Sequence, residues 1–150
     1  MTTSPVPRSA LLLGASGLLP SLAMLVAMGL LPGHRAAAAT VGIAYGALIA
    51  SFVGGAWWGL AAARAEAAAQ PRILVLSVVP CLLAWPALLI APAAGLLLLA
   101  AVFATLPAMD RDLRARGVAP DWWLSLRLPL SFGMATLHAA SAAILLVSAP

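Results

Sequence analysis

A single histidine lies deep inside the last apolar stretch of the chain, where an ionisable side chain is costly. His138 stands near the middle of residues 128–150, which contain no Asp, Glu, Lys or Arg. In a helix, Ser131, Met134 and Ser141 share one face with it. An ionisable group at such depth in a membrane can contact a haem or a quinone, or relay protons. A neutral imidazole bonded to either serine or to a facing carbonyl is the simpler interpretation, because a second strong ligand is missing.

The acidic side chains offer little catalytic chemistry by their positions. All four fall in connections between apolar stretches, so we expect no buried carboxylate: Glu66, Asp110, Asp112 and Asp121. Asp110 and Arg127 bracket one cytoplasmic connection and are predicted to form a polar pair where two helices emerge. Cys81 is the one cysteine, which excludes an intrachain disulfide. We therefore predict no catalytic residue, no metal site and no bound cofactor, with His138 as the remaining candidate for a cofactor contact.

Small residues recur every four positions in the second apolar stretch. The repeat comprises Gly42, Gly46, Ala50 and Gly54, and Gly55 and Gly59 extend it to another face. In lipid the hydrophobic force between helices is weak, so helices associate through close packing of small residues. We interpret this repeat as the surface on which other helices of the same chain pack. Contact with a partner protein and a groove for a ligand are the alternatives.

The composition requires a membrane around most of the chain. Of the 150 residues, 64% are hydrophobic and 8% are charged, and the mean hydropathy is +1.08. Soluble domains have about 45–50% apolar and about 25% charged residues. A soluble chain of this length could not bury so much apolar surface. The basic residues are dispersed arginines that form no continuous basic face, which excludes a nucleic-acid partner.

Apolar length and helix breakers divide the chain into five membrane-spanning helices within one all-α domain, residues 1–150. The uncharged stretch 73–109 would be about 55 Å long as one helix, nearly twice a hydrocarbon thickness of about 30 Å. The chain must therefore turn within it, and Pro92 and Gly95 mark the place. The first span is too long for the apolar core of a signal peptide, so we expect it to be retained, with a kink near Pro20. The predicted spans are roughly 10–31, 38–62, 73–91, 93–109 and 128–148.

Residues 110–127 form the one substantial polar segment. We expect a short cytoplasmic helix there that lies at the lipid headgroups. Indole rings favour the boundary between membrane and water, because they combine an apolar body with one polar N–H group. The predicted interfacial anchors are Trp57, Trp58, Trp122 and Trp123.

The arginines predict the orientation of the five helices. An odd number of spans places the two termini on opposite sides of the membrane. Seven of the eight arginines fall on the side of the N-terminus, and Arg35 alone falls on the other. Loops rich in arginine stay in the cytoplasm. We therefore predict that the N-terminus is inside and the C-terminus outside.

A specific string of residues runs through most of the chain. It begins with Tyr45, Gly46, Ala47, Ser51, Phe52, Val53, Gly54, Gly55, Trp58 and Gly59, and it continues with Pro80, Ala84, Trp85, Asp110, Pro120, Asp121, Trp122, Trp123, Leu126, Arg127, Leu130 and Ser131. This string resembles the family of domain of unknown function 3429, whose members include transmembrane protein 69 of mitochondria. Members often have histidine at position 57, and the pattern favours tyrosine at position 123. The resemblance implies a multi-pass protein of the bacterial inner membrane with mitochondrial relatives, and it implies no reaction.

These features together favour a non-catalytic membrane protein. We expect an accessory, assembly or scaffold subunit of a larger membrane complex, and the mitochondrial relatives indicate a respiratory or related electron-transfer complex. Its partners would be membrane lipid and other membrane-protein chains, or further copies of itself. A small-solute permease or channel acting as a homo-oligomer is the alternative. A protein that contacts a quinone or haem through His138 is the second alternative.

Overall fold

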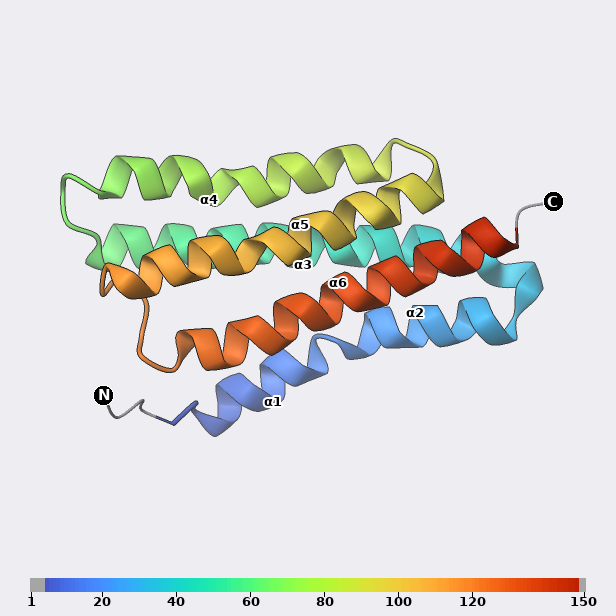
Figure 1. Cartoon of the computed structure of the whole chain (residues 1–150), viewed down its shortest axis with the longest axis horizontal. Helices are drawn as coiled ribbons and strands as arrows, with labels where there is room; N and C mark the ends of the chain where they lie inside the picture. The colour runs from blue at the N-terminus through green and yellow to red at the C-terminus, as the bar shows by residue number, and fades with distance from the viewer. Residues whose placement is uncertain (1–4, 149–150) are drawn as a thin grey trace.

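The computed structural model describes residues 5–148, which form helices and no strand (Figure 1). Five helical segments are long and apolar enough to cross a membrane, which confirms the predicted all-α, multi-pass fold. The elements are α1 (Arg8–Ser16), α2 (Leu19–Leu30), the 3-10 helix η1 (Pro32–His34), α3 (Arg35–Arg64), α4 (Gln70–Ala84), the 3-10 helix η2 (Trp85–Leu88), α5 (Pro92–Ala115) and α6 (Trp123–Val147).

The first span consists of two helices, α1 and α2, that are separated by a short break. Helix α1 ends at Ser16 and α2 begins at Leu19, with Pro20 in its first turn. Proline has no N–H group and cannot bond to the carbonyl four residues earlier, so it interrupts a helix on its N-terminal side. The Tyr45 hydroxyl of α3 donates a 2.7 Å hydrogen bond to the Gly17 carbonyl at this break. The interruption that we predicted near Pro20 is therefore present, and a neighbouring helix satisfies part of it.

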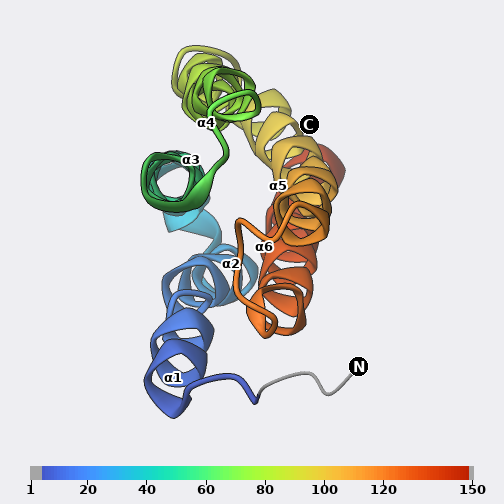
Figure 2. The ribbon, with the colours of Figure 1, turned by 90° about the vertical axis from the view of Figure 1, so that its left-hand side faces the viewer.

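Helix α3 is the central element, and it lies against α2, α4, α5 and α6 (Figure 2). Each step of four residues turns about 40° around a helix axis, so a repeat at this spacing winds slowly around α3. Gly42 accordingly faces Met24 of α2, whereas Gly46 faces α6 and Gly54 faces the backbone of Ser77 in α4. The repeat from Gly42 to Gly54 is thus an internal packing surface that serves several helices in turn. Gly55 and Gly59, which we also expected to pack against helices of this chain, have nothing within 4 Å of an added Cβ atom, which corrects that part of the prediction.

The hairpin that we predicted within 73–109 joins α4 to α5. Pro86 lies in η2 and Pro92 opens α5, so rigid residues bound the turn on both sides. Gly95 lets α5 approach closely, because a side chain there would overlap the Ala87 carbonyl. From this turn α4 and α5 diverge toward their other ends (Figure 1).

No separate helix lies between α5 and α6, which corrects our expectation of a short interfacial helix in residues 110–127. Helix α5 continues to Ala115 and then stops at Gly117, whose φ of 68° is the left-handed value that favours glycine. The N–H groups of Gly117 and Val118 bond to the Arg114 and Leu113 carbonyls, at 3.1 and 3.0 Å. Val118 is buried beside Leu113, so the connection folds back onto the bundle.

The charges gather at one end of the bundle. Within residues 5–148, seven arginines and the four acidic residues lie where α1, α4 and α6 begin and where α3 and α5 end (Figure 1). We call this the charged end. Arg35 lies at the opposite end, in the first turn of α3.

Candidate functional site

A buried carboxylate at the charged end joins three helices. Asp110 of α5 has no solvent-exposed surface. The indole N–H groups of Trp57 in α3 and Trp123 in α6 both donate to its Oδ1, at 2.9 and 2.7 Å. Arg127 of α6 donates from Nε to its Oδ2 at 3.2 Å. These four residues form what we call the Asp110 cluster, and the predicted pair of Asp110 and Arg127 is one part of it.

Two expectations are corrected by this cluster. We expected no carboxylate inside the bundle, but Asp110 lies within α5 because the helix runs on to Ala115 before it ends. We also expected Trp57 at the membrane boundary, but its side chain is buried, 3% exposed, and its N–H group points inward to Asp110. A charged residue at the edge of an apolar run can still be buried when hydrogen-bond partners surround it.

The other three predicted anchors lie nearer the surface. Trp58 is 49% exposed on the outside of α3. Trp122 and Trp123 are half-buried, and their ring centroids are 5.9 Å apart. Trp123 therefore belongs to the Asp110 cluster through its N–H group while its ring reaches the edge of the bundle.

The hydrogen bonds of the Asp110 cluster indicate a structural role. The carboxylate accepts from two indoles and one guanidinium, and charge-assisted bonds of this kind are the stronger ones in proteins. A general base needs a lone pair within reach of a substrate proton. Here both oxygens of Asp110 are occupied by side chains of the chain itself. The geometry fixes α3, α5 and α6 relative to one another.

A crevice beside the Asp110 cluster lies between α1, α3 and α6 and has a volume of about 350 Å³. Arg127 is the one charged residue in its lining, and its Nη2 also donates to the Ser131 hydroxyl at 3.4 Å. A molecule in this crevice would meet apolar walls and a guanidinium already paired with Asp110. The other lining residues include Leu13, Phe52, Trp123, Leu126 and Leu130.

Two further carboxylates, Asp112 and Asp121, form ion pairs at the end of α5 and in the loop that follows it. Asp112 lies 2.9 Å from Arg116 and 3.8 Å from Arg72, and Asp121 lies 2.6 Å from Arg114. These side chains are partly exposed, so water screens the pairs and each one adds little stability. Within residues 5–148, His, Cys, Asp and Glu side chains do not gather in a group of three, so no metal centre is assigned there.

His138 is buried, 2% exposed, and lies between α3, α5 and its own helix α6. Its Nδ1 lies 2.8 Å from the Met134 carbonyl, which can only accept, so Nδ1 carries the proton. The Nε2 atom has no hydrogen-bond partner within residues 5–148 and packs against Gly46, where a Cβ atom would overlap it. The acceptor is a carbonyl of the same helix, rather than Ser131, Ser141 or the carbonyl of a facing helix that we predicted.

The surroundings of His138 leave no room for a cofactor. The cavity beside the ring has a volume of about 10 Å³, which is close to the smallest space that holds one water molecule. The Phe103 ring covers another side, with a centroid distance of 5.3 Å. A haem or a quinone ring does not fit there without separating α3 from α6.

The sequence contained one sign of the Asp110 cluster that spacing alone did not reveal. Trp57 and Trp123 are the two residues at which this chain differs from the family pattern that it resembles. Their indole N–H groups are the ones that donate to Asp110. Histidine and tyrosine, which that pattern favours there, are also hydrogen-bond donors. Each side chain considered at these two positions can donate a hydrogen bond, and in this structure both donors bond to Asp110.

Comparison with known proteins identifies the family of this chain but assigns no reaction to it. Residues 6–143 match the family described as "Protein of unknown function (DUF3429)". Transmembrane protein 69 of Xenopus tropicalis is 36% identical over 131 residues, which cover 83% of this chain and 50% of that protein. The chain thus spans about half the length of the curated relative that it matches. No solved structure matches the chain.

Proposed function

The chain belongs to the DUF3429 family of multi-pass membrane proteins, and we propose that it is a non-catalytic accessory, assembly or scaffold subunit of a larger membrane complex. A respiratory or related electron-transfer complex is the class of partner that we propose. The buried polar side chains support this view, because Asp110 is occupied by donors of the chain itself and His138 is enclosed. The protein would then act through contact with other membrane proteins.

The observation that carries this proposal is a pair of glycines on the outer face of α3. A Cβ atom added at Gly55 or Gly59 would meet nothing within 4 Å, in contrast to Gly46 and Gly54, which are closely packed. Phe52, one turn before Gly55, is 73% exposed. Two glycines four residues apart on an apolar helix form a surface where a second helix can approach closely. Among residues 5–148, no other helix packs on these two glycines.

The test is the size of the complex after gentle solubilisation and native separation. We expect the wild-type chain to migrate within a larger assembly. Gly55→Leu and Gly59→Leu should release it as a small protein without loss of fold, because the added side chains project into open space. Val75→Leu is the control, since Val75 is 66% exposed on another helix. A wild-type chain that migrates alone contradicts the proposal, and an assembly of identical chains favours the homo-oligomeric permease instead.

We further propose that the charged end faces the cytoplasm of a bacterium, with the chain in its inner membrane. Seven arginines at that end support this orientation, because arginine-rich segments resist translocation. In a Cys81→Ser background, Gly33→Cys should react with a membrane-impermeant maleimide added to spheroplasts. Glu66→Cys should react only after the membrane is opened. The reverse pattern contradicts the proposed orientation.

A further inference from the structure

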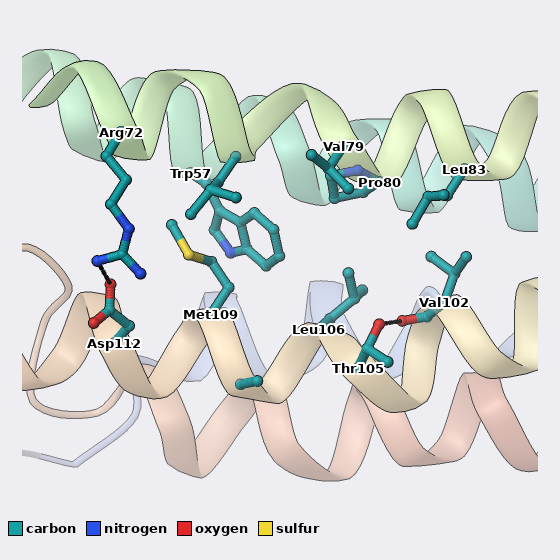
Figure 3. A pocket seen from close by; sticks show the side chains of 12 residues that line it. Trp57, Arg72, Val79, Pro80, Leu83, Val102, Thr105, Leu106, Met109 and Asp112 are labelled. Carbon is teal, nitrogen blue, oxygen red and sulfur yellow. Dashed lines mark hydrogen bonds and ion pairs between the residues drawn. The ribbon is translucent and has the colours of Figure 1, made fainter.

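A groove lies between α4 and α5 and opens sideways from the bundle (Figure 3). Its volume is about 330 Å³. The two helices are joined by a short hairpin between Leu88 and Pro92 and diverge from there toward the charged end (Figure 1). Its walls carry apolar side chains, among them Leu76, Val79, Leu83, Val102, Leu106 and Met109.

The few polar groups inside the groove are already hydrogen-bonded within the chain. The Thr105 hydroxyl donates to the Val102 carbonyl at 2.7 Å, as Figure 3 shows. The Trp57 indole forms the floor, and its N–H group is bonded to Asp110 behind it. Its ring therefore presents an apolar surface to an occupant. The interior therefore suits a hydrocarbon chain.

The mouth of the groove at the charged end is lined by charged side chains. Arg72 and Asp112 face each other there (Figure 3), with 3.8 Å between Arg72 Nη1 and Asp112 Oδ2. Asp112 is closer to Arg116, at 2.9 Å, and the Arg72 side chain is 61% exposed. Arg72 is thus only loosely paired. Seven arginines and four acidic residues leave the charged end with an excess of positive charge.

The length of the groove matches the depth of one lipid layer. Arg72 and Leu83 mark its two ends on α4 and are eleven residues apart. At about 1.5 Å per residue the groove extends roughly 16 Å, about half of a hydrocarbon core of about 30 Å. An acyl chain whose headgroup lies at the level of Arg72 would end near Leu83.

We propose that this groove binds one anionic phospholipid, with an acyl chain along Leu76, Val79 and Leu83 and the phosphate at Arg72. Arginine recognises phosphate through several parallel N–H groups, which supports the assignment of the headgroup. The chain would pack on Trp57, whose indole also bonds to Asp110. Lipid binding would therefore stabilise the Asp110 cluster as well as the two helices that form the groove.

The test compares two lipids with identical acyl chains, added to the purified protein in a neutral detergent. Phosphatidylglycerol should raise the Tm by about 5 °C or more at concentrations far above its dissociation constant, and phosphatidylcholine should raise it less. Arg72→Gln should remove this difference. Arg64→Gln is the matched control, because it removes the same charge from the same end but lies outside the groove.

A second pair of variants tests the position of the acyl chain. Val79→Phe fills the groove and should lower the amount of phosphatidylglycerol that native mass spectrometry detects on the protein. Val75→Phe, on the exposed face of α4, should leave this amount unchanged. Equal effects of the two lipids, or an unchanged lipid preference in Arg72→Gln, would overturn the proposal. So would an equal rise in Tm with inorganic phosphate alone, since that would locate binding in the headgroup contact only.

Discussion

Two buried ionisable side chains, Asp110 of α5 and His138 of α6, contact their neighbouring helices in different ways. At the charged end, Asp110 accepts hydrogen bonds from Trp57 of α3 and from Trp123 and Arg127 of α6. Nearer the middle of α6, the His138 ring bonds to a carbonyl of its own helix, and its Nε2 packs against Gly46 of α3 with no hydrogen-bond partner in the part of the chain that the structure describes. The same two helices are joined by polar bonds in one place and by close fit in the other.

This difference indicates where sequence changes should be costly and for what reason. Around Asp110 the cost comes from donors and a charge that lose their partner. Around His138 it comes from volume, because the ring occupies the space that the missing side chain of Gly46 leaves. We therefore expect the Asp110 region to be sensitive to the removal of polar atoms, and the His138 region to be sensitive to the addition of carbon atoms.

The largest effect is expected for Asp110→Ala. This change leaves the Arg127 guanidinium and two indole N–H groups without their acceptor, so the free energy of unfolding should fall by about 3–5 kcal/mol. Reversible unfolding in detergent measures the change. Asp121→Ala removes a carboxylate from an exposed ion pair in the same region and should have little effect. Similar losses in both variants would contradict the claim that the buried hydrogen bonds of Asp110 stabilise the fold more than an exposed ion pair does.

Removal of a single indole donor should cost less than removal of the acceptor. Trp57→Phe keeps most of the ring and deletes the N–H group that bonds to Asp110, so we expect a loss of about 1.5–3 kcal/mol. Trp58→Phe is its neighbour and control, because Trp58 is half-exposed on the outer face of α3. Thermal unfolding followed by circular dichroism compares the two. A Trp58 effect as large as that of Trp57 would contradict the assignment.

The close fit at His138 is tested by adding one methyl group. Gly46→Ala should lower the free energy of unfolding by about 1–3 kcal/mol, because its Cβ would overlap the imidazole. Gly55→Ala should have no such effect, because its surroundings are open. The double variant with Gly46→Ala and His138→Ala should lose less free energy of unfolding than the sum of the two single losses, because the smaller side chain at position 138 leaves room for the added methyl group. Strict additivity would show that the ring and the glycine do not compete for space.

The smallest effect is expected for His138→Leu. The new side chain has a similar volume and loses one hydrogen bond to the Met134 carbonyl, while the unpaired Nε2 is removed as well. A net change within about 1.5 kcal/mol follows from the size of one neutral hydrogen bond. The same unfolding assay measures it. A much larger loss would mean that Nε2 has a partner, such as a bound water, that matters for the fold.

Hydropathy and helix breakers predicted the architecture because each of them acts locally. Five apolar stretches, a turn close to Pro92 and a kink near Pro20 all follow from chain length, proline geometry and the thickness of the membrane. The turn itself precedes Pro92, and Gly95, which we expected to mark it, lies inside α5. The glycine repeat likewise identified α3 as the central helix. The repeat did not show that its members face different helices, since that depends on how the other spans are arranged around α3.

The polar cluster could not be located from the sequence, because its members are far apart in it. Trp57 and Asp110 are 53 positions apart and come together only when α3 and α5 pack. Asp110 is the first charged residue after an apolar run, and we expected it to mark the end of the helix. In the structure the helix continues to Ala115, and Asp110 is buried. The Schellman turn at Gly117 lies further on and sets the true end of α5.

Trp57 and Asp110 hold α3 and α5 together by a direct hydrogen bond inside the bundle. A double-mutant cycle with Trp57→Phe and Asp110→Ala, measured by reversible unfolding in detergent, tests this bond most directly. We expect a coupling free energy of about 1–3 kcal/mol between the two changes. Effects that add within about 0.5 kcal/mol would contradict it.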